Sequence, residues 1–231
     1  MIGATFGDKH TDSWGLKLLQ TTTGFPEAKI FKVDNPAGNG SWDITGCITG
    51  GDVKYKERTI QMTFDALGGY SSWRALVSDI AGCLHGRRLK IILDTDPSFY
   101  YIGRLSVDTE KSNAVTHRVV ITGAADPYKY EITSSTEDWL WDTFNFDTDI
   151  IRDYRNIEVN GEYTLIIPGR RKRVIPTFIC TAPLTITYSG QSYDLPAGES
   201  KVTNIALGEG DHELIFRGHG VVTVEYRGAS L

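Results

Sequence analysis

Apolar and polar residues alternate along much of this 231-residue chain, and that period of two favours a fold built mainly from β-strands. In residues 59–67 every second position is apolar: Ile60, Met62, Phe64 and Ala66. Residues 89–93 and 101–107 repeat the pattern on either side of Asp96-Pro97, a dipeptide typical of turns, and they predict a β-hairpin. Residues 117–130 continue the pattern and predict one more strand.

A single segment, residues 71–86, has the periodicity of a helix instead. Its apolar residues are spaced i, i+3, i+4, i+7, i+8 and i+11: Trp73, Leu76, Val77, Ile80, Ala81 and Leu84. Ser71 or Ser72 suits the N-cap and Gly86 the end of the helix. We expect this helix to lie across a sheet, packed by its apolar stripe, with Arg74, Ser78 and Asp79 exposed.

The composition changes at residues 134–153, which are rich in aspartate and aromatic residues and have no clean period. We interpret this segment as the crossing between an N-terminal domain, residues 1–133, and a C-terminal domain, residues 134–231. Short strand candidates follow at close spacing, which predicts a small antiparallel β-sandwich of about 100 residues. These candidates are residues 162–167, 174–181, 184–189, 191–196, 200–207, 212–218 and 221–228.

Composition narrows the class of protein. The hydrophobic fraction of 40% and charged fraction of 23% are ordinary for a soluble globular domain. No apolar run approaches the roughly 18 residues of a membrane span, and the N-terminus lacks the features of a signal peptide, so we expect the mature chain to begin at Met1. The net charge of −5 gives no overall attraction to nucleic acid. The main local exception is the basic run from Arg170 to Arg173, interpreted as a solvated loop with a phosphate site as the less favoured alternative.

Cysteines and histidines give no sign of a metal site. The cysteines, Cys47, Cys83 and Cys180, are far apart and never form a CxxC pair, so we expect reduced core residues rather than disulfides or zinc ligands. The histidines are scattered, without the i, i+4 spacing of a helical metal site: His10, His85, His117, His212 and His219.

Carboxylate pairs are the most enzyme-like feature of the sequence. Asp94 and Asp96 adjoin a turn, whereas Asp147 and Asp149 fall in the predicted crossing between domains. Neither pair has the setting of a glycosidase or the continuation of an EF-hand loop, and no glycine-rich segment matches a nucleotide-binding motif. The sequence therefore predicts no catalytic, cofactor-binding or metal-binding residues, and it favours binding or assembly over catalysis.

Four segments together resemble a known family. They are residues 6–19 (FGDKHTDSWGLKLL), 73–108, 125–131 (ADPYKYE) and 216–231 (FRGHGVVTVEYRGASL). In order and spacing they are similar to the distal tail proteins (Dit) of long-tailed siphophages, over nearly the whole chain.

The resemblance implies a structural hub at the tail tip of a virion, made in the cytoplasm of the bacterial host. It implies a hexameric ring built by an N-terminal β-sandwich with its helix and an extended hairpin, and a galectin-like C-terminal β-sandwich that projects outward. The implied partners are the tail tube protein, the tail-associated hub or lysin protein, and receptor-binding or adsorption proteins, while DNA passes through the lumen without specific binding. No enzyme activity and no cofactor are implied.

Two segments could form an arm between subunits: residues 90–108, or residues 35–59, whose glycines suit a long loop. The sequence leaves that choice open. It also leaves open three other functions, namely a carbohydrate-binding (lectin-like) module, a small glycosidase or esterase, and the hub of a contractile or tail-like injection particle.

Overall fold

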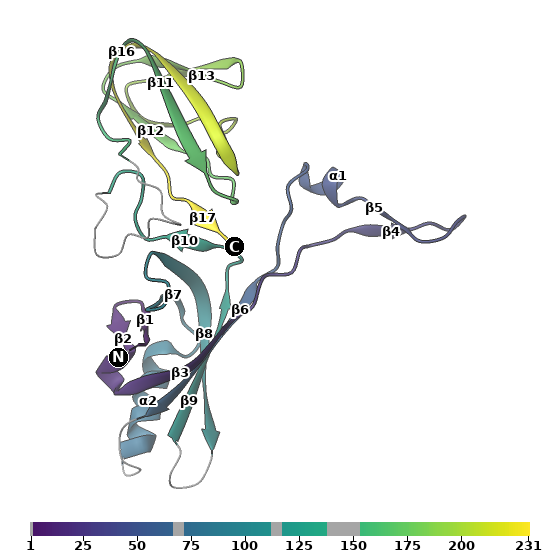
Figure 1. Cartoon of the computed structure of the whole chain (residues 1–231), viewed down its shortest axis with the longest axis vertical. Coiled ribbons are helices and arrows are strands. Elements are labelled where there is room, and N and C mark those ends of the chain that lie inside the picture. Colours follow the sequence, from purple (N-terminus) through teal and green to yellow (C-terminus); the bar gives the residue numbers. More distant parts are fainter. Residues whose placement is uncertain (1, 67–71, 112–116, 138–152) are drawn as a thin grey trace. The chain divides into compact units, whose positions relative to one another are not determined.

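The computed structural model describes residues 2–66, 72–111, 117–137 and 153–231. The fold is mainly β, as the alternation predicts, and the chain forms two compact units (Figure 1). The first unit comprises Met1–Thr95, Tyr101–Pro127 and Leu231, and the second comprises Asp96–Tyr100 and Tyr128–Ser230. The tip of the predicted hairpin therefore belongs to the second unit. Most of the predicted crossing at residues 134–153 lies outside the described residues, as do Asp147 and Asp149.

One antiparallel sheet forms the frame of the first unit. Its strands, in spatial order, are β2 (Lys9–His10), β1 (Ala4–Phe6), β7 (Arg88–Leu93), β8 (Phe99–Lys111), β9 (His117–Ala125), β6 (Arg58–Ala66) and β3 (Leu16–Thr23). The predicted hairpin is confirmed, because β7 and β8 pair with Arg88 opposite Arg104 and Ile91 opposite Tyr101. The alternation in β6 is also confirmed, since its apolar residues are buried and Thr59 and Gln61 are exposed.

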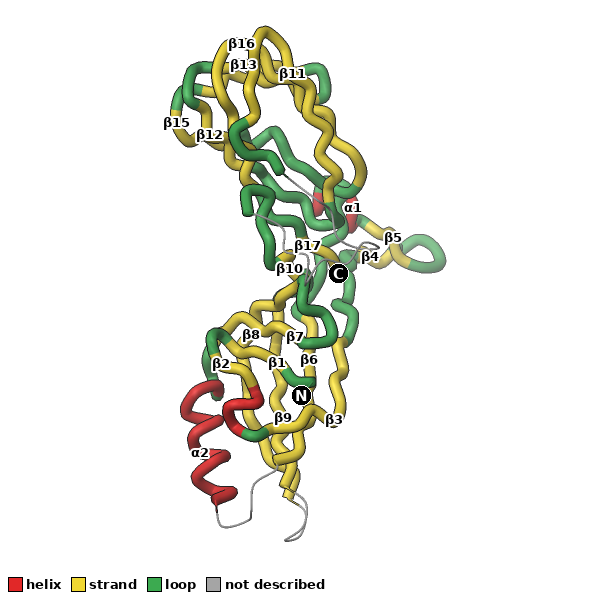
Figure 2. Tube along the Cα trace, turned by 60° about the vertical axis from the view of Figure 1, so that its left-hand side comes forward, coloured by secondary structure: helices red, strands yellow, loops and turns green. Residues whose placement is uncertain are grey.

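The predicted helix is α2 (Trp73–Leu84), which lies along one face of this sheet (Figure 2). Ile80 and Leu84 are fully buried in the core, whereas Trp73, Leu76 and Val77 are half-buried against it. The helix ends as predicted, because Gly86 follows it with a φ of +75°. Ser72 occupies the N-cap position, but its side chain makes no capping hydrogen bond.

Strand β3 was not predicted, and its irregular pairing explains why. Its register against β6 shifts between Leu18 and Gln20, so Leu19 is an extra, exposed residue. Such a bulge interrupts the period of two on which the prediction depends.

The second unit closes an antiparallel sheet around its own apolar core. The strand order is β14 (Gln191–Leu195), β13 (Leu184–Tyr188), β16 (Gly210–Glu225), β12 (Thr177–Cys180) and β15 (Gly198–Lys201), and β11 (Ile157–Gly169) also pairs with β16. Strand β10 (Lys129–Glu131) lies between β17 (Ala229–Ser230) and the first residues of β8.

Ser135 connects the beginning of the second unit to its last long strand. The Ser135 hydroxyl donates to the Val224 carbonyl at 2.8 Å and accepts from the Tyr226 N–H at 2.8 Å. All three groups are buried, so this side chain satisfies two backbone groups that water does not reach.

Four of the predicted strands were wrong. Residues 212–218 and 221–228 are not two strands, because β16 runs unbroken through Gly218 and pairs with β11 along its length. Residues 117–130 form two strands, β9 and β10, rather than one. In residues 200–207 only the first two residues belong to a strand, and Ile205 and Leu207 are buried from a loop.

The three cysteines are free, but they are not all core residues. Cys180 is buried and Cys83 half-buried, whereas Cys47 is exposed on the five-residue helix α1 (Thr45–Thr49). The prediction of a core position is therefore wrong for Cys47.

Candidate functional site

Asp94 and Asp96, the carboxylate pair that falls within the described residues, do not act together. Asp94 accepts hydrogen bonds from the backbone N–H of Gly3 and from His10, whereas Asp96 forms a 2.6 Å ion pair with Lys129. These two carboxylates thus serve separate local contacts. Within the described part of the chain, no three His, Cys, Asp or Glu side chains are grouped so that they could hold a metal ion.

The other histidines also serve local contacts. His85 Nδ1 accepts from the Val107 N–H, and the His117 ring lies 5.3 Å from that of Trp73. His212 contacts the Tyr188 hydroxyl and a backbone carbonyl, and His219 contacts Asn160.

The basic run 170–173 is engaged within the second unit. Arg170 donates from Nε to Glu131 at 2.8 Å, and both side chains are largely buried. Lys172 lies 4.4 Å from the centre of the Tyr130 ring and donates to its hydroxyl. Arg171 lies 3.6 Å from Glu209. The interpretation as a purely solvated loop is therefore wrong for Arg170 and Lys172.

The most distinctive surface is an extended ribbon, residues 24–57, which we call the arm. It continues from the ends of β3 and β6 and carries β4 (Lys32–Asp34), β5 (Ser41–Asp43) and α1 (Figure 1). Of the two segments that the sequence offered, residues 35–59 therefore form most of the extension, whereas residues 90–108 lie in the paired strands β7 and β8 and the turn between them.

Backbone hydrogen bonds hold the two halves of the arm together. Near its root, Gly24 donates to Thr59, and the Ala28 and Tyr55 backbones form a bridge. At the far end β4 pairs with β5, and the chain reverses through the glycines of residues 35–40. The arm is thus a paired hairpin rather than the long loop that its glycines indicated.

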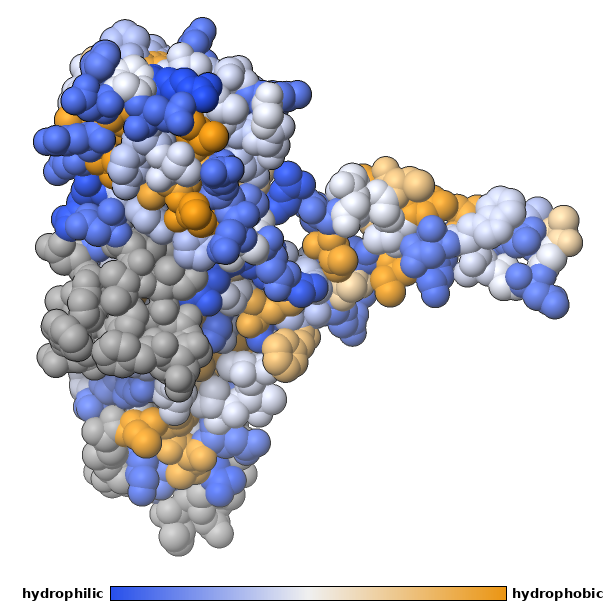
Figure 3. Space-filling view, turned by 45° about the horizontal axis from the view of Figure 1, so that its top comes forward, coloured by the Kyte–Doolittle hydropathy of each residue, from blue (hydrophilic) through white to orange (hydrophobic). Residues whose placement is uncertain are grey.

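The arm has no core of its own. Of residues 24–57 only Pro26 is buried. Seven large apolar side chains are exposed: Phe25, Ile30, Phe31, Val33, Trp42, Ile48 and Val53. Figure 3 shows such apolar side chains along the arm on one face of the molecule. An isolated two-stranded hairpin is marginally stable in water, and an apolar surface of this kind marks an interaction site.

The cross-strand register sorts the far end of the arm into two faces. Val33 lies directly opposite Trp42, and the two are 46% and 62% exposed. The neighbouring pair, Lys32 opposite Asp43, points to the other face, because side chains alternate along a strand. One face of this hairpin is thus apolar and the other charged.

Two carboxylates of the arm are held in their ionised form. Hydrogen bonds from the Thr45 side chain and backbone lower the pKa of Asp43, which precedes α1. The hydrogen bond and charge of Lys56 lower the pKa of Glu27 near the root. Both carboxylates are exposed, so their charges stay in water and help to keep the free arm hydrated.

A shallow apolar pocket of about 610 Å³ lies on the first unit between residues 13–15 and α2. Trp14, Ala75 and Leu76 supply its apolar wall. Asp79 at its edge accepts from the Trp14 indole N–H at 2.7 Å, and this bond, together with Lys9, lowers the pKa of that carboxyl. The pocket has no convergent set of reactive groups, so the arm is the stronger candidate for function.

Comparison with known proteins finds a likeness in fold. No family model and no curated protein match the sequence. Among solved structures, the chain is similar to the Dit protein (gp 19.1) of SPP1, described as a paradigm of the hub adsorption apparatus in phages that infect Gram-positive bacteria. The TM-score is 0.62 at 11% identity, over 100% of both chains. This chain has the fold of a distal tail protein.

The predicted resemblance to distal tail proteins is thereby confirmed at the level of the fold. A weaker similarity links the chain to the baseplate of phage p2 in its activated conformation, with a TM-score of 0.35 and 9% identity over 94% of this chain and 92% of the other. Among the described residues, no helix has both the length and the apolar character needed to cross a membrane.

Proposed function

We propose that this protein is the distal tail protein of a siphophage, a structural component of the virion. Six copies would form a ring at the distal end of the tail tube. The ring would join the tube to a tail-associated hub or lysin protein and to receptor-binding or adsorption proteins. The protein would bind no cofactor and catalyse no reaction, and DNA would pass through its lumen without specific binding.

The observation that carries the proposal is the arm, on a chain whose fold follows that of the SPP1 Dit protein from end to end. Its seven exposed apolar residues contribute to neither of the two cores. Covering them requires another molecule. A second copy of the chain supplies one for every arm.

The arm also suits the geometry of a ring. In a cyclic assembly each subunit uses two different patches, one to grip a neighbour and one to be gripped. The arm can serve as the gripping patch, because its apolar face has to fit a different surface on the neighbouring subunit and not a second copy of itself. We therefore assign residues 24–57 as the arm between subunits, with the second unit left to carry the adsorption proteins.

Imaging of the tail tip of the producing particle tests the proposal. We expect a six-fold ring with an open lumen, in which the first unit surrounds the centre and the second unit lies at the periphery. An antibody against the second unit would mark that periphery. Absence of the protein from the particle, or a single copy on a fibre, would refute the proposal.

A solution experiment complements the imaging. Cys47 lies exposed on the arm, so a photoreactive maleimide attached there should cross-link one copy to the next. The same probe on Ser78→Cys, in a chain with Cys47→Ser, gives the matched control on an exposed helix position of the first unit. A mass near six times 25.6 kDa in native mass spectrometry supports the ring, and the measurement is made both for the protein alone and with its tail partners present.

A further inference from the structure

A buried cation lies where the arm joins the sheet. Arg58 is the first residue of β6 and directly follows the arm, yet only 4% of it is exposed. Burial of a guanidinium is costly unless its donors find acceptors and its charge finds compensation. The contacts of Arg58 therefore show which parts of the fold it joins.

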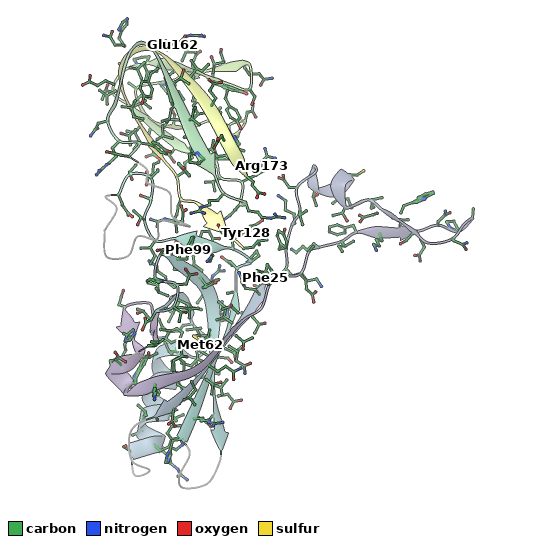
Figure 4. All side chains as sticks on the ribbon, in the orientation of Figure 1. Phe25, Met62, Phe99, Tyr128, Glu162 and Arg173 are labelled. Atoms are coloured by element: carbon green, nitrogen blue, oxygen red, sulfur yellow. The ribbon has the colours of Figure 1, made fainter. Side chains whose placement is uncertain are left out.

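Those contacts reach both the opposite half of the arm and the body of the sheet. Arg58 donates from Nε to the Gly24 carbonyl at 2.9 Å and from Nη1 to the Pro127 carbonyl at 3.3 Å. Its guanidinium carbon lies 5.1 Å from the centre of the Tyr101 ring and 5.9 Å from that of Phe25. Figure 4 shows Phe25 at the root of the arm. Aromatic faces at these distances stabilise a cation.

Other contacts at the root are weak by comparison. The Lys56–Glu27 ion pair is well exposed on both sides, and such pairs contribute little to order. The backbone bond from Gly24 to Thr59 joins the two halves of the arm but does not tie them to Tyr101 or Pro127. The Arg58 side-chain contacts link the arm root to the start of β8 and to the segment after β9.

We infer that Arg58 is the positioning residue that fixes the direction in which the arm leaves the sheet. An arginine suits this task because its planar fork holds two acceptors at a fixed angle while its faces stack on rings, which a lysine cannot reproduce. That the arm, once directed in this way, reaches a neighbouring copy in the ring rests on the proposed function. The positioning itself is a property of the single chain, and the two can fail separately.

Electron–electron double resonance on the monomer tests the inference. One spin label is attached to Cys47 on the arm and the other to Ser78→Cys on α2, in a chain with Cys83→Ala; Cys180 is buried and does not compete. In this parent we expect one narrow distribution of distances. In Arg58→Met, which keeps the length of the side chain but loses the fork and the charge, we expect loss of that narrow peak. The thermal transition of the second unit should not move.

The controls separate positioning from folding. Arg88→Met removes another arginine of the same unit, one paired with Asp126 on the surface, and should leave the distance distribution unchanged. Arg58→Lys should broaden it partly. Phe25→Ala is a second test in case Arg58→Met does not fold. Phe25 is 82% exposed, so its removal should broaden the distance distribution without lowering the melting temperature. A distribution as narrow as the parent's in both Arg58→Met and Phe25→Ala would overturn the inference.

Discussion

Replacement of Trp42 by alanine should weaken self-association without harming the fold. Trp42 is 62% exposed at the far end of the arm, opposite Val33, and belongs to neither core. An enclosed tryptophan buries roughly 150–250 Å², so covering its exposed part removes about 90–150 Å² from water. At about 25 cal/mol per Å² the loss in Trp42→Ala is about 2–4 kcal/mol for each arm contact, or roughly 30- to 700-fold in the dissociation constant.

Sedimentation equilibrium over a range of concentrations measures this loss directly, either for the protein alone or with its tail partners present. Ile166→Ala is the matched control, because Ile166 is 58% exposed on β11 of the second unit and also large and apolar. Both variants should melt at the parent's temperature. Equal association constants for the parent and Trp42→Ala would refute the assignment of the arm as the contact between copies.

Three further predictions concern the fold. Ile80→Asp places a charge in the closed core under α2 and should abolish cooperative unfolding of the first unit, whereas the exposed Arg74→Ala should melt like the parent. A fragment of residues 132–231 should fold alone, since the second core closes within it, and one that begins after Ser135 should melt earlier; a disordered circular dichroism spectrum from the longer fragment would contradict this. Gly218→Ala should lower the melting temperature of the second unit. The φ of Gly218 is +130°, and the new methyl would lie 2.9 Å from a leucine side chain of β13. An unchanged transition would show that the strand relaxes freely.

The elements that could be predicted from sequence are those whose apolar period is set by one buried face. In α2 the spacing of Ile80 and Leu84 follows from a single stripe against the sheet, and in β6 the alternation follows from one covered side. Such patterns are local, and a window of a few residues contains them. The hairpin β7–β8 adds a turn signal at Asp96-Pro97, which makes its pairing local as well.

Non-local pairing explains the errors in the second unit. Strand β16 continues through Gly218 because β11 pairs beside it, with Gly161 opposite that glycine. The partner lies more than fifty residues away in the sequence, whereas the local sequence around Gly218 and Gly220 resembles a break. A glycine in a strand therefore marks either an end or a bend, and only the partner strand decides which.

The arm was predicted only in part, because here too the sequence does not show what covers an apolar face. Its glycines indicated an extension, but Val33 and Trp42 have the alternation of a strand with one covered face, and the described residues leave both side chains exposed. A sequence pattern reports that a side chain will be buried; it does not report by which molecule. The role of Arg58 could not be predicted from the sequence, because its side chain contacts residues that are 34 and 69 positions away.

The separation of the arm from both cores has a consequence for the order of events in assembly. Neither apolar core includes a residue of 24–57, so we expect folding of the monomer not to depend on the arm being covered. The exposed carboxylates at Glu27 and Asp43 keep their charge to lower pH than usual, because hydrogen bonds depress their pKa, and they keep the uncovered arm hydrated meanwhile. A chain built in this way can fold first and associate afterwards. Substitutions on the apolar face of the arm should thus change how many copies join, and substitutions such as Ile80→Asp should change whether there is a subunit to join.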